Sequence, residues 1–159
     1  MNKIFTSGNK VVPFNKKINV PGDKSISIRF VLLASQAKGA SKAYNLLMSE
    51  DVLAAIDSLK KLGIKIIINK NYCTVIGNGI NGFKYKENTI LNAKNSGTLG
   101  RLILGLLVKS PFKIKMIGDK SLSKRDFSRV TIPLGKLGVK FSYKIKNKLP
   151  LIILGTQSV

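Results

Sequence analysis

The 159-residue sequence contains no histidine, no tryptophan and one cysteine. Without histidine the chain lacks the side chain that most often acts as a general base or metal ligand, so we expect neither a metal nor another cofactor. Cys73 cannot form an internal disulfide bond, which fits a reducing cytoplasm. The longest apolar run, residues 102–108, is far shorter than the ~20 residues of a membrane span, and residues 1–10 lack a signal peptide's apolar core. We therefore expect a cytoplasmic protein without a membrane segment.

Acidic residues are also scarce, because 7 Asp and Glu stand against 28 Lys and Arg, a net charge of +21. Lysine supplies 24 of the basic residues and arginine only 4. The lysines are dispersed, which is typical of compositional drift at tolerant surface positions rather than of a nucleic-acid-binding face. The same charge attracts small anions, and this is the interpretation that we prefer.

An internal repeat divides the chain into two similar units. At a constant offset of 75 residues, Asp51–Lys65 and Asp126–Lys140 share 6 identical residues in 15. A duplication of this kind predicts that one supersecondary unit occurs twice. The hydrophobic periodicity and the helix-capping residues predict an α/β fold of two βαβαββ units, at about 17–77 and about 88–155.

Each unit is expected to contain four strands and two helices. The first unit has predicted strands at Lys17–Val20, Ser41–Leu47, Ile64–Ile68 and Cys73–Ile76, and predicted helices at Ser25–Ala37 and Glu50–Leu62. The second has predicted strands at Thr89–Leu91, Lys113–Ile117, Val139–Ile145 and Leu149–Leu154, and predicted helices at Ser96–Val108 and from about Arg129 to Leu137. The helix at 96–108 is apolar on nearly all sides, which predicts that it is buried.

The stretch Pro21–Arg29 carries the most chemical information. A Pro-Gly turn places Lys24 and Ser25 at the start of a helix, where free backbone N–H groups and the helix dipole favour an anion. Arg29 lies one turn beyond Ser25 and can reach the same side. The pattern also fits a plain helix cap beside two solvated cations, and physical reasoning alone leaves both interpretations open.

Two further polar stretches lie in the second unit. Asn95–Arg101 opens a helix with small residues that allow a ligand close to the backbone, and Asn95 and Thr98 offer hydrogen bonds. Gly118–Asp126 is expected to form a polar loop that leads into a helix. Taken singly, the first stretch also fits a cap with a packing glycine, and the second fits a solvated connection.

The positions of the four arginines favour anion binding. Arg29, Arg101 and Arg125 fall within the three stretches, and Arg129 lies one turn beyond Arg125. A guanidinium group grips phosphate or carboxylate through two parallel hydrogen bonds, which an ammonium group cannot do. Arginine retained against a strong lysine bias therefore indicates a small ligand with phosphate and carboxylate groups.

Together the motifs resemble the EPSP synthase family, the 3-phosphoshikimate 1-carboxyvinyltransferases. The matching segments are PGDKSISIR at Pro21–Arg29, NSGTLGR at Asn95–Arg101 and GDKSLSKR at Gly118–Arg125. The resemblance implies transfer of the enolpyruvyl group of phosphoenolpyruvate to shikimate 3-phosphate, with release of phosphate, in the shikimate pathway of aromatic amino-acid biosynthesis. Family members are usually monomeric.

The resemblance also implies roles for individual residues. It assigns shikimate 3-phosphate binding to Lys24, Ser25 and Arg29, assigns phosphoenolpyruvate binding to Lys24, Gly97 and Arg125, and gives no certain role to Asn95, Thr98 and Arg101. A larger side chain at Gly97 would crowd the phosphoenolpyruvate pocket. No catalytic residue is assigned, because the family's acid and base residues are expected beyond this chain.

Two positions depart from the family pattern. Ile28 stands where the family usually has histidine, and Asp126 stands where it usually has proline. We expect Ile28 to remove a polar group near the site. We expect Asp126 to pair with Arg125 and to weaken its grip on a carboxylate.

Length is the largest departure. Family members have two domains of three units each, with the active site between them, so the resemblance implies that residues 1–159 form a partial first domain. The third unit and the second domain would then be absent, the strand at 17–20 would cross to the second domain, and the chain alone would show little or no turnover. The alternative function is a non-catalytic basic βαβαββ module that binds RNA, against which the dispersed lysines and few aromatic residues argue.

Overall fold

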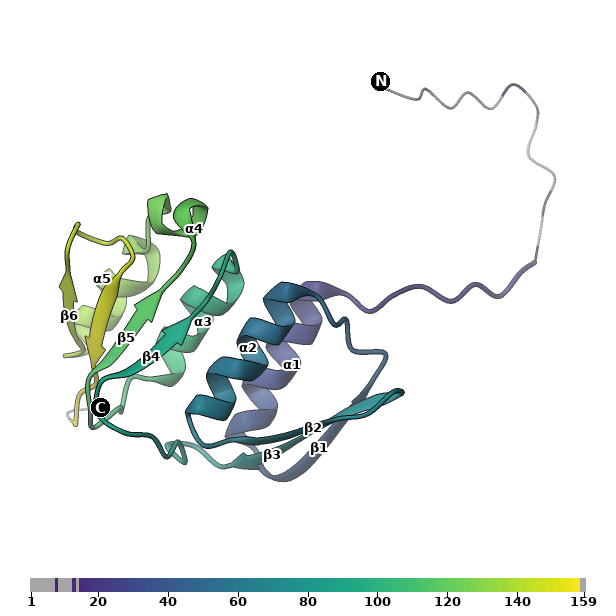
Figure 1. Ribbon diagram of the computed structural model, residues 1–159, viewed down its shortest axis with the longest axis horizontal. Coiled ribbons are helices and arrows are strands. Elements are labelled where there is room, and N and C mark those ends of the chain that lie inside the picture. The colour runs from purple at the N-terminus through teal and green to yellow at the C-terminus, as the bar shows by residue number, and fades with distance from the viewer. Residues whose placement is uncertain (1–7, 9–12, 14, 158–159) are drawn as a thin grey trace.

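Two helices and a three-stranded sheet make up the first unit (Figure 1). The computed structural model describes residues 8, 13 and 15–157. The first unit contains α1 (Lys24–Gln36), β1 (Lys38–Tyr44), α2 (Glu50–Lys61), β2 (Lys65–Ile68) and β3 (Tyr72–Asn78). Strands β1 and β2 both pair with β3 in antiparallel fashion, so the order is β1-β3-β2. The predicted β2–β3 hairpin through residues 69–71 is confirmed, with Ile68 opposite Cys73.

The second unit repeats this order with one more strand and one more short helix. It contains β4 (Thr89–Asn92), α3 (Gly97–Leu106), β5 (Ile114–Ile117), α4 (Lys120–Lys124), α5 (Ser128–Lys136), β6 (Lys140–Tyr143) and β7 (Leu151–Leu154). Its sheet has the order β4-β5-β7-β6, in which only β4 and β5 are parallel. Gly63 and Gly138, which precede β2 and β6, both have positive φ angles, 83° and 92°. The predicted α/β class with two repeated units is confirmed.

One hydrophobic core joins the two units. Helix α3 contacts α1, α2 and α5. Fully buried side chains of both units belong to a single hydrophobic cluster, among them Val31, Leu59, Ile103 and Phe127. The expectation that α3 is buried nearly all round is wrong in one respect. Leu102 is 41% exposed, because the side of α3 that carries it has no covering element within the described residues.

The predicted strand at Lys17–Val20 is wrong. These residues lie outside any strand, and Ile18 and Val20 are 75% and 64% exposed. By analogy with β4 beside β5, a fourth strand of the first sheet would pair with the free edge of β1, and no described segment lies there. Alternation of apolar residues does not make a strand unless a partner satisfies its backbone groups.

Helix α4 interrupts a segment that was expected to be a loop. Asp119 Oδ1 accepts a hydrogen bond from the Leu122 backbone N–H at 2.7 Å, and this cap starts a short helix whose Leu122 side chain is buried. Strand β1 begins three residues earlier than predicted, because Lys38–Tyr44 runs in register along β3. Helix α5 begins at Ser128, which leaves Pro133 just past its first turn, as expected.

Substitution of Gly22 tests how closely the chain before α1 approaches the β1–α2 loop. A Cβ atom at Gly22 would clash with the backbone oxygen of Asn45 and would lie 3.0 Å from the Leu47 nitrogen. Because backbone atoms cannot swing away, we expect Gly22→Ala to lower the free energy of unfolding by about 1–3 kcal/mol.

The control is Gly105→Ala in α3, where an added Cβ meets no atom within 4 Å. It should raise the free energy of unfolding by about 0.5–1 kcal/mol, because alanine favours helix more than glycine does. Urea denaturation of both variants measures the difference, and a Gly22→Ala protein as stable as the wild type would contradict the close approach.

Candidate anion-binding site at the helix N-termini

The start of α1 is built as a helix cap that leaves donors free. Asp23 is the N-cap residue, and its Oδ1 accepts a hydrogen bond from the Ile26 N–H at 2.7 Å. Lys24 and Ser25 are the first two residues of the helix, so their backbone N–H groups have no acceptor within it. The predicted cap is confirmed. It presents free N–H groups and the positive end of the helix dipole at the surface.

Lys24 has a partner that was not predicted. Its ammonium nitrogen lies 3.1 Å from Asp51 Oδ2, in the first turn of α2. The Lys24 side chain is 52% exposed and that of Asp51 is 19% exposed, so the pair lies at the surface with the carboxylate on its inner side. No local pattern in the sequence predicts this pair, because Lys24 and Asp51 lie on different helices.

Arg29 is exposed on α1, one turn beyond Ser25. It borders a cavity of about 240 Å³ whose other walls are apolar side chains of α1 and α3, namely Leu32, Leu33, Leu102 and Leu106. Ile28, by contrast, is fully buried in the core. The expectation that Ile28 removes a polar group from the site is therefore wrong, because its side chain points into the protein rather than toward the exposed Lys24 and Arg29.

The start of α3 brings two guanidinium groups together. Ser96 is its N-cap, and its Oγ accepts a hydrogen bond from the Leu99 N–H at 3.3 Å. A Cβ atom at Gly97 would lie 3.0 Å from Arg101 Nη1 and 3.1 Å from Arg125 Nη1. Gly97 therefore leaves the space over the first turn of α3 to two cationic groups, one from α3 itself and one from the end of α4.

Asn95 holds Arg125 in place. Arg125 Nη2 donates a hydrogen bond to Asn95 Oδ1 at 2.9 Å, and Asn95 Nδ2 donates one to Asp119 Oδ2 at 2.7 Å. The Leu122 N–H, followed by the Asn95 amide and the Arg125 charge, holds the pKa of Asp119 below its ordinary value. The chain Asp119–Asn95–Arg125 thus fixes a guanidinium group beside Gly97 without neutralising it directly. This role of Asn95 was not predicted.

Asp126 does not pair with Arg125, so that expectation is wrong. Its Oδ1 accepts a hydrogen bond from the Ser128 N–H at 2.5 Å at the start of α5, and bonds to Ser128 are the main cause of its lowered pKa. Arg101, rather than Arg125, contacts this residue, because its Nη2 donates a hydrogen bond to the Asp126 backbone carbonyl at 3.1 Å. The Arg101 guanidinium also lies 5.3 Å from the centre of the buried Phe127 ring, and its Nε is buried without a hydrogen-bond partner.

The three motifs lie toward the same end of the molecule. In Figure 1 the N-terminal ends of α1, α2 and α3 all point toward the upper side, where α4 also lies. The structure brings Gly97, Arg101 and Arg125 into one cluster, and it places Lys24 and Ser25 at the same end on a neighbouring helix. Thr98, at the second position of α3, is half-buried there.

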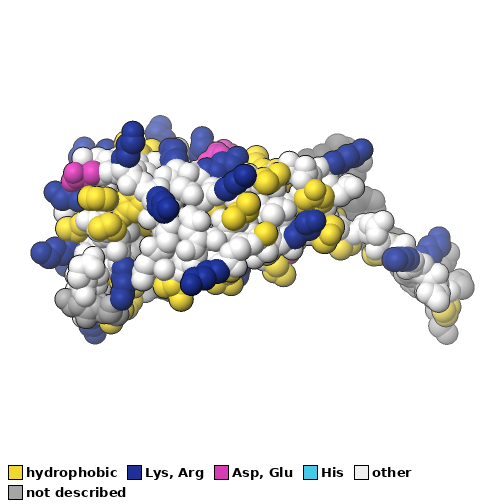
Figure 2. All heavy atoms as spheres, turned by 90° about the horizontal axis from the view of Figure 1, so that it is seen from below, with side chains coloured by type: hydrophobic (Ala, Val, Ile, Leu, Met, Phe, Trp, Pro, Cys, Tyr) yellow, Lys and Arg dark blue, Asp and Glu magenta, His cyan; other side chains and the backbone are white. Residues whose placement is uncertain are grey.

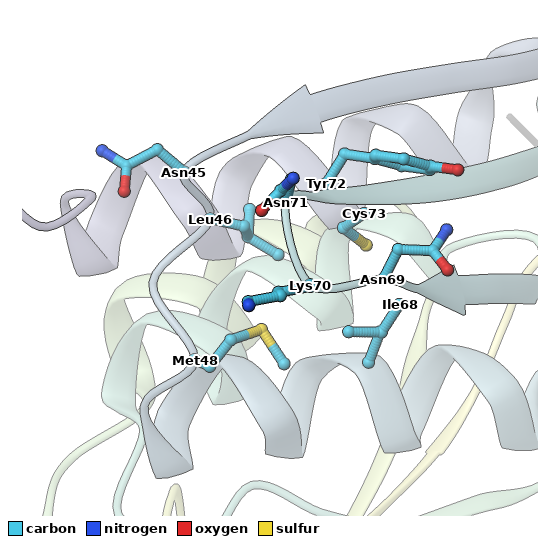
Figure 3. Close-up of a pocket in the computed structure, with 9 residues that line it drawn as sticks. All are labelled: Asn45, Leu46, Met48, Ile68, Asn69, Lys70, Asn71, Tyr72 and Cys73. Atoms are coloured by element: carbon cyan, nitrogen blue, oxygen red, sulfur yellow. The ribbon is translucent and has the colours of Figure 1, made fainter.

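A cavity of about 330 Å³ lies elsewhere, between the β2–β3 hairpin and the loop that follows β1 (Figure 3). Asparagine side chains and Lys70 line its polar part, and Met48 and Ile68 line its apolar part. Cys73 also borders it but is 1% exposed, and burial raises the pKa of its thiol. The thiol therefore stays protonated and packed rather than reactive.

The described part of the chain contains neither a metal-binding cluster nor a membrane-spanning helix. No group of three or more Asp, Glu or Cys side chains there is arranged to hold a metal ion. Among residues 8, 13 and 15–157, no helix is long and apolar enough to cross a bilayer. Figure 2 shows Lys and Arg side chains scattered over the lower face of the molecule, with uncharged surface between them.

The chain is an α/β protein of two repeated units, with basic side chains near the N-terminal ends of α1 and α3. The chain matches the family model described as EPSP synthase (3-phosphoshikimate 1-carboxyvinyltransferase) over residues 9–159. It belongs to this family.

Its relatives are longer. Proteins named 3-phosphoshikimate 1-carboxyvinyltransferase from Streptococcus pyogenes serotype M2 (strain MGAS10270) and serotype M49 (strain NZ131) are each 44% identical over 138 residues, which cover 87% of this chain and 32% of the relative. Two structures of EPSP synthase from Acinetobacter baumannii superpose with a TM-score of 0.81 at 34% identity, covering 88% and 89% of this chain and 32% of theirs. The chain spans about a third of the length of these proteins.

Acid titration tests the role of Asp119. Because its pKa is lower in the folded protein than the ordinary value of 3.8, its bonds stabilise the fold above that value, and this stability is lost as the pH falls through the folded pKa. In Asp119→Asn the side-chain oxygen that caps α4 remains, but the stability linked to ionisation of the carboxylate is lost. The thermal midpoint of this variant should therefore fall less steeply than that of the wild type between about pH 5 and pH 2.

The matched control is Asp57→Asn on α2, an exposed position whose side chain forms no hydrogen bond among the described residues. Its acid profile should follow that of the wild type. If Asp119→Asn also follows the wild-type profile, the bonds of the Asp119 carboxylate carry no proton-linked stability.

Proposed function

We propose that this chain forms one wall of the site at which an EPSP synthase transfers the enolpyruvyl group of phosphoenolpyruvate to shikimate 3-phosphate. The observation that carries the proposal is the convergence of Arg101 and Arg125 over Gly97, at the end of the molecule where Lys24 and Ser25 begin α1. Both substrates are polyanions, and guanidinium groups and helix N-termini are the groups that bind phosphate and carboxylate most strongly.

The proposal divides the site between the two helix starts. Lys24, Ser25 and Arg29 would bind shikimate 3-phosphate, and Lys24, Gly97 and Arg125 would bind phosphoenolpyruvate. Gly97 contributes space and a backbone donor, while Arg125 contributes a guanidinium group already oriented by Asn95. Preorganised donors of this kind can stabilise the charge that develops as the hydroxyl adds to phosphoenolpyruvate and phosphate then leaves.

The groups that transfer protons in this addition and elimination would come from outside the chain. We therefore propose that the isolated chain binds substrate with little or no turnover, and that a third βαβαββ unit and a second domain complete the enzyme. Leu33 on α1 and Leu102 on α3 both line the cavity beside Arg29. Their side chains are 67% and 41% exposed. An apolar face of this kind suits the packing of a further unit.

The proposed reaction takes place in the cytoplasm, within a protein that acts as a monomer. RNA binding, the alternative function, gains no support from the scattered arrangement of basic side chains on the face seen in Figure 2. A small-anion site explains why arginine rather than lysine occupies positions 29, 101 and 125.

Calorimetry with shikimate 3-phosphate tests the α1 half of the site. Arg29→Ala should weaken binding by about 10- to 100-fold, because a charge-assisted hydrogen bond to phosphate contributes about 1.5–3 kcal/mol. The matched control is Arg129→Ala, which removes an exposed arginine from α5 and should leave the affinity close to that of the wild type. Equal losses in the two variants would indicate nonspecific attraction to the net charge.

Gly97→Ala tests the α3 half. The added methyl group would meet only the side-chain ends of Arg101 and Arg125, which can shift without moving the backbone, so the fold should keep its stability. The affinity for phosphoenolpyruvate, titrated with shikimate 3-phosphate present, should fall at least about tenfold, because the two guanidinium groups lose their held positions. At Gly100 a methyl group would instead press on the buried Phe127 ring at 3.3 Å. Gly100→Ala should therefore lower the thermal midpoint, and unchanged affinity in Gly97→Ala would place phosphoenolpyruvate elsewhere.

A further inference from the structure

Asp51 differs from the other aspartates that stand at helix starts. Asp23, Asp119 and Asp126 each accept a hydrogen bond from a nearby backbone N–H, at 2.7, 2.7 and 2.5 Å. Asp51 lies in the first turn of α2, yet among the described residues its carboxylate accepts no such bond. Its Oδ2 instead lies 3.1 Å from Lys24 Nζ on α1.

The internal repeat sharpens this contrast. Asp51 and Asp126 align in the sequence repeat, 75 residues apart, although Asp51 is the second residue of α2 and Asp126 lies two residues before α5. In the second unit Asp126 accepts a hydrogen bond from the nearby backbone N–H of Ser128. In the first unit Asp51 forms an ion pair with Lys24 on another helix. Helix capping therefore does not explain Asp51. The Asp51 carboxylate contacts Lys24 instead.

The pair is also unusual for this chain. Although 24 lysines outnumber the acids by more than three to one, Lys24–Asp51 is the one Lys–carboxylate pair within 4.0 Å among the described residues. The exposed Glu50, next to Asp51 in the same turn, has no such partner. A scarce acid is thus placed against the lysine that the proposed function assigns to both substrates.

Short hydrogen bonds hold the two helix starts in register. Ser27 is only 4% exposed. Its Oγ donates a hydrogen bond to the Asp23 carbonyl at 2.7 Å and accepts one from the Leu47 N–H at 3.0 Å. The side chain of Asn45 donates to the Val20 carbonyl at 3.0 Å. These bonds tie the beginning of α1 to the loop that leads into α2, so the carboxylate of Asp51 has a fixed position relative to Lys24.

We propose that Asp51, on α2, is a positioning residue that holds the Lys24 ammonium group at the candidate anion site at the start of α1. A lysine side chain has several rotatable bonds and loses much rotamer entropy when a ligand fixes it. A carboxylate on the inner side of the pair restricts that freedom before the ligand arrives, while half of the lysine side chain stays exposed for the anion. The inference rests on the proposed function, because it concerns how Lys24 binds substrate.

Positioning and simple charge make opposite predictions. Asp51→Asn removes a negative charge beside a site for anions, so electrostatics alone predicts tighter binding. If Asp51 positions Lys24, the same change weakens binding of shikimate 3-phosphate to the chain, and we expect about a tenfold loss by calorimetry. Asp51→Glu, which keeps the carboxylate, should recover part of the affinity.

Glu50→Gln is the matched control, because it removes the same charge from the same turn without touching Lys24. It should bind shikimate 3-phosphate as tightly as the wild type or slightly more tightly. In a Lys24→Met background, Asp51→Asn should cause no further loss, since its effect passes through the lysine. Thermal unfolding of each variant establishes that it is folded.

The outcomes separate the two proposals. If the folded wild type binds no shikimate 3-phosphate, the proposed function fails and the inference falls with it. If the wild type binds but Asp51→Asn binds equally or more tightly, the proposed function stands and the positioning role is overturned. A loss that persists in the Lys24→Met background would also overturn it, because Asp51 would then act independently of Lys24.

Discussion

The missing side chain at Gly97 is the constraint on which the candidate site depends. It leaves room for Arg101 and Arg125 to bring their guanidinium groups within about 3 Å of one point above the first turn of α3. Two like charges so close repel each other unless other groups hold them. The Asp126 carbonyl and the Phe127 ring hold Arg101, and Asn95, braced by Asp119, holds Arg125. An anion placed there would meet donors that are already oriented.

The few acids in the chain show how this charge is organised. Five of the seven stand at helix starts, namely Asp23, Glu50, Asp51, Asp119 and Asp126. Three of them cap backbone groups, and one contacts Lys24. None is hydrogen-bonded to the guanidinium groups of Arg29 or Arg125 within the described residues, so these stay available to a ligand. The net charge of +21 is therefore less informative than the placement of a few groups at one end of the fold.

Much of this could be predicted from the sequence, because caps, glycine stops and the 75-residue repeat are local signals. They predict α1, α2 and the β2–β3 hairpin closely, and they identify the segments that contain Lys24, Gly97 and Arg125. What failed depends on contacts between distant residues. Lys17–Val20 has the alternation of a strand but no described neighbour to pair with, and Ile28 looks like a site residue by its position but points into the core. The pairing of Lys24 with Asp51 and the bridge through Asn95 likewise require the packed structure.

The most direct test of the central claim is the pattern of backbone amide shifts in NMR spectra of the chain as shikimate 3-phosphate, then phosphoenolpyruvate, is added. We expect saturable shifts first at Lys24, Ser25 and neighbouring residues of α1, and then at Gly97 and the segment around Arg125. Shifts centred on the cavity at residues 69–73, or small unsaturable shifts spread over the dispersed lysines, would contradict it.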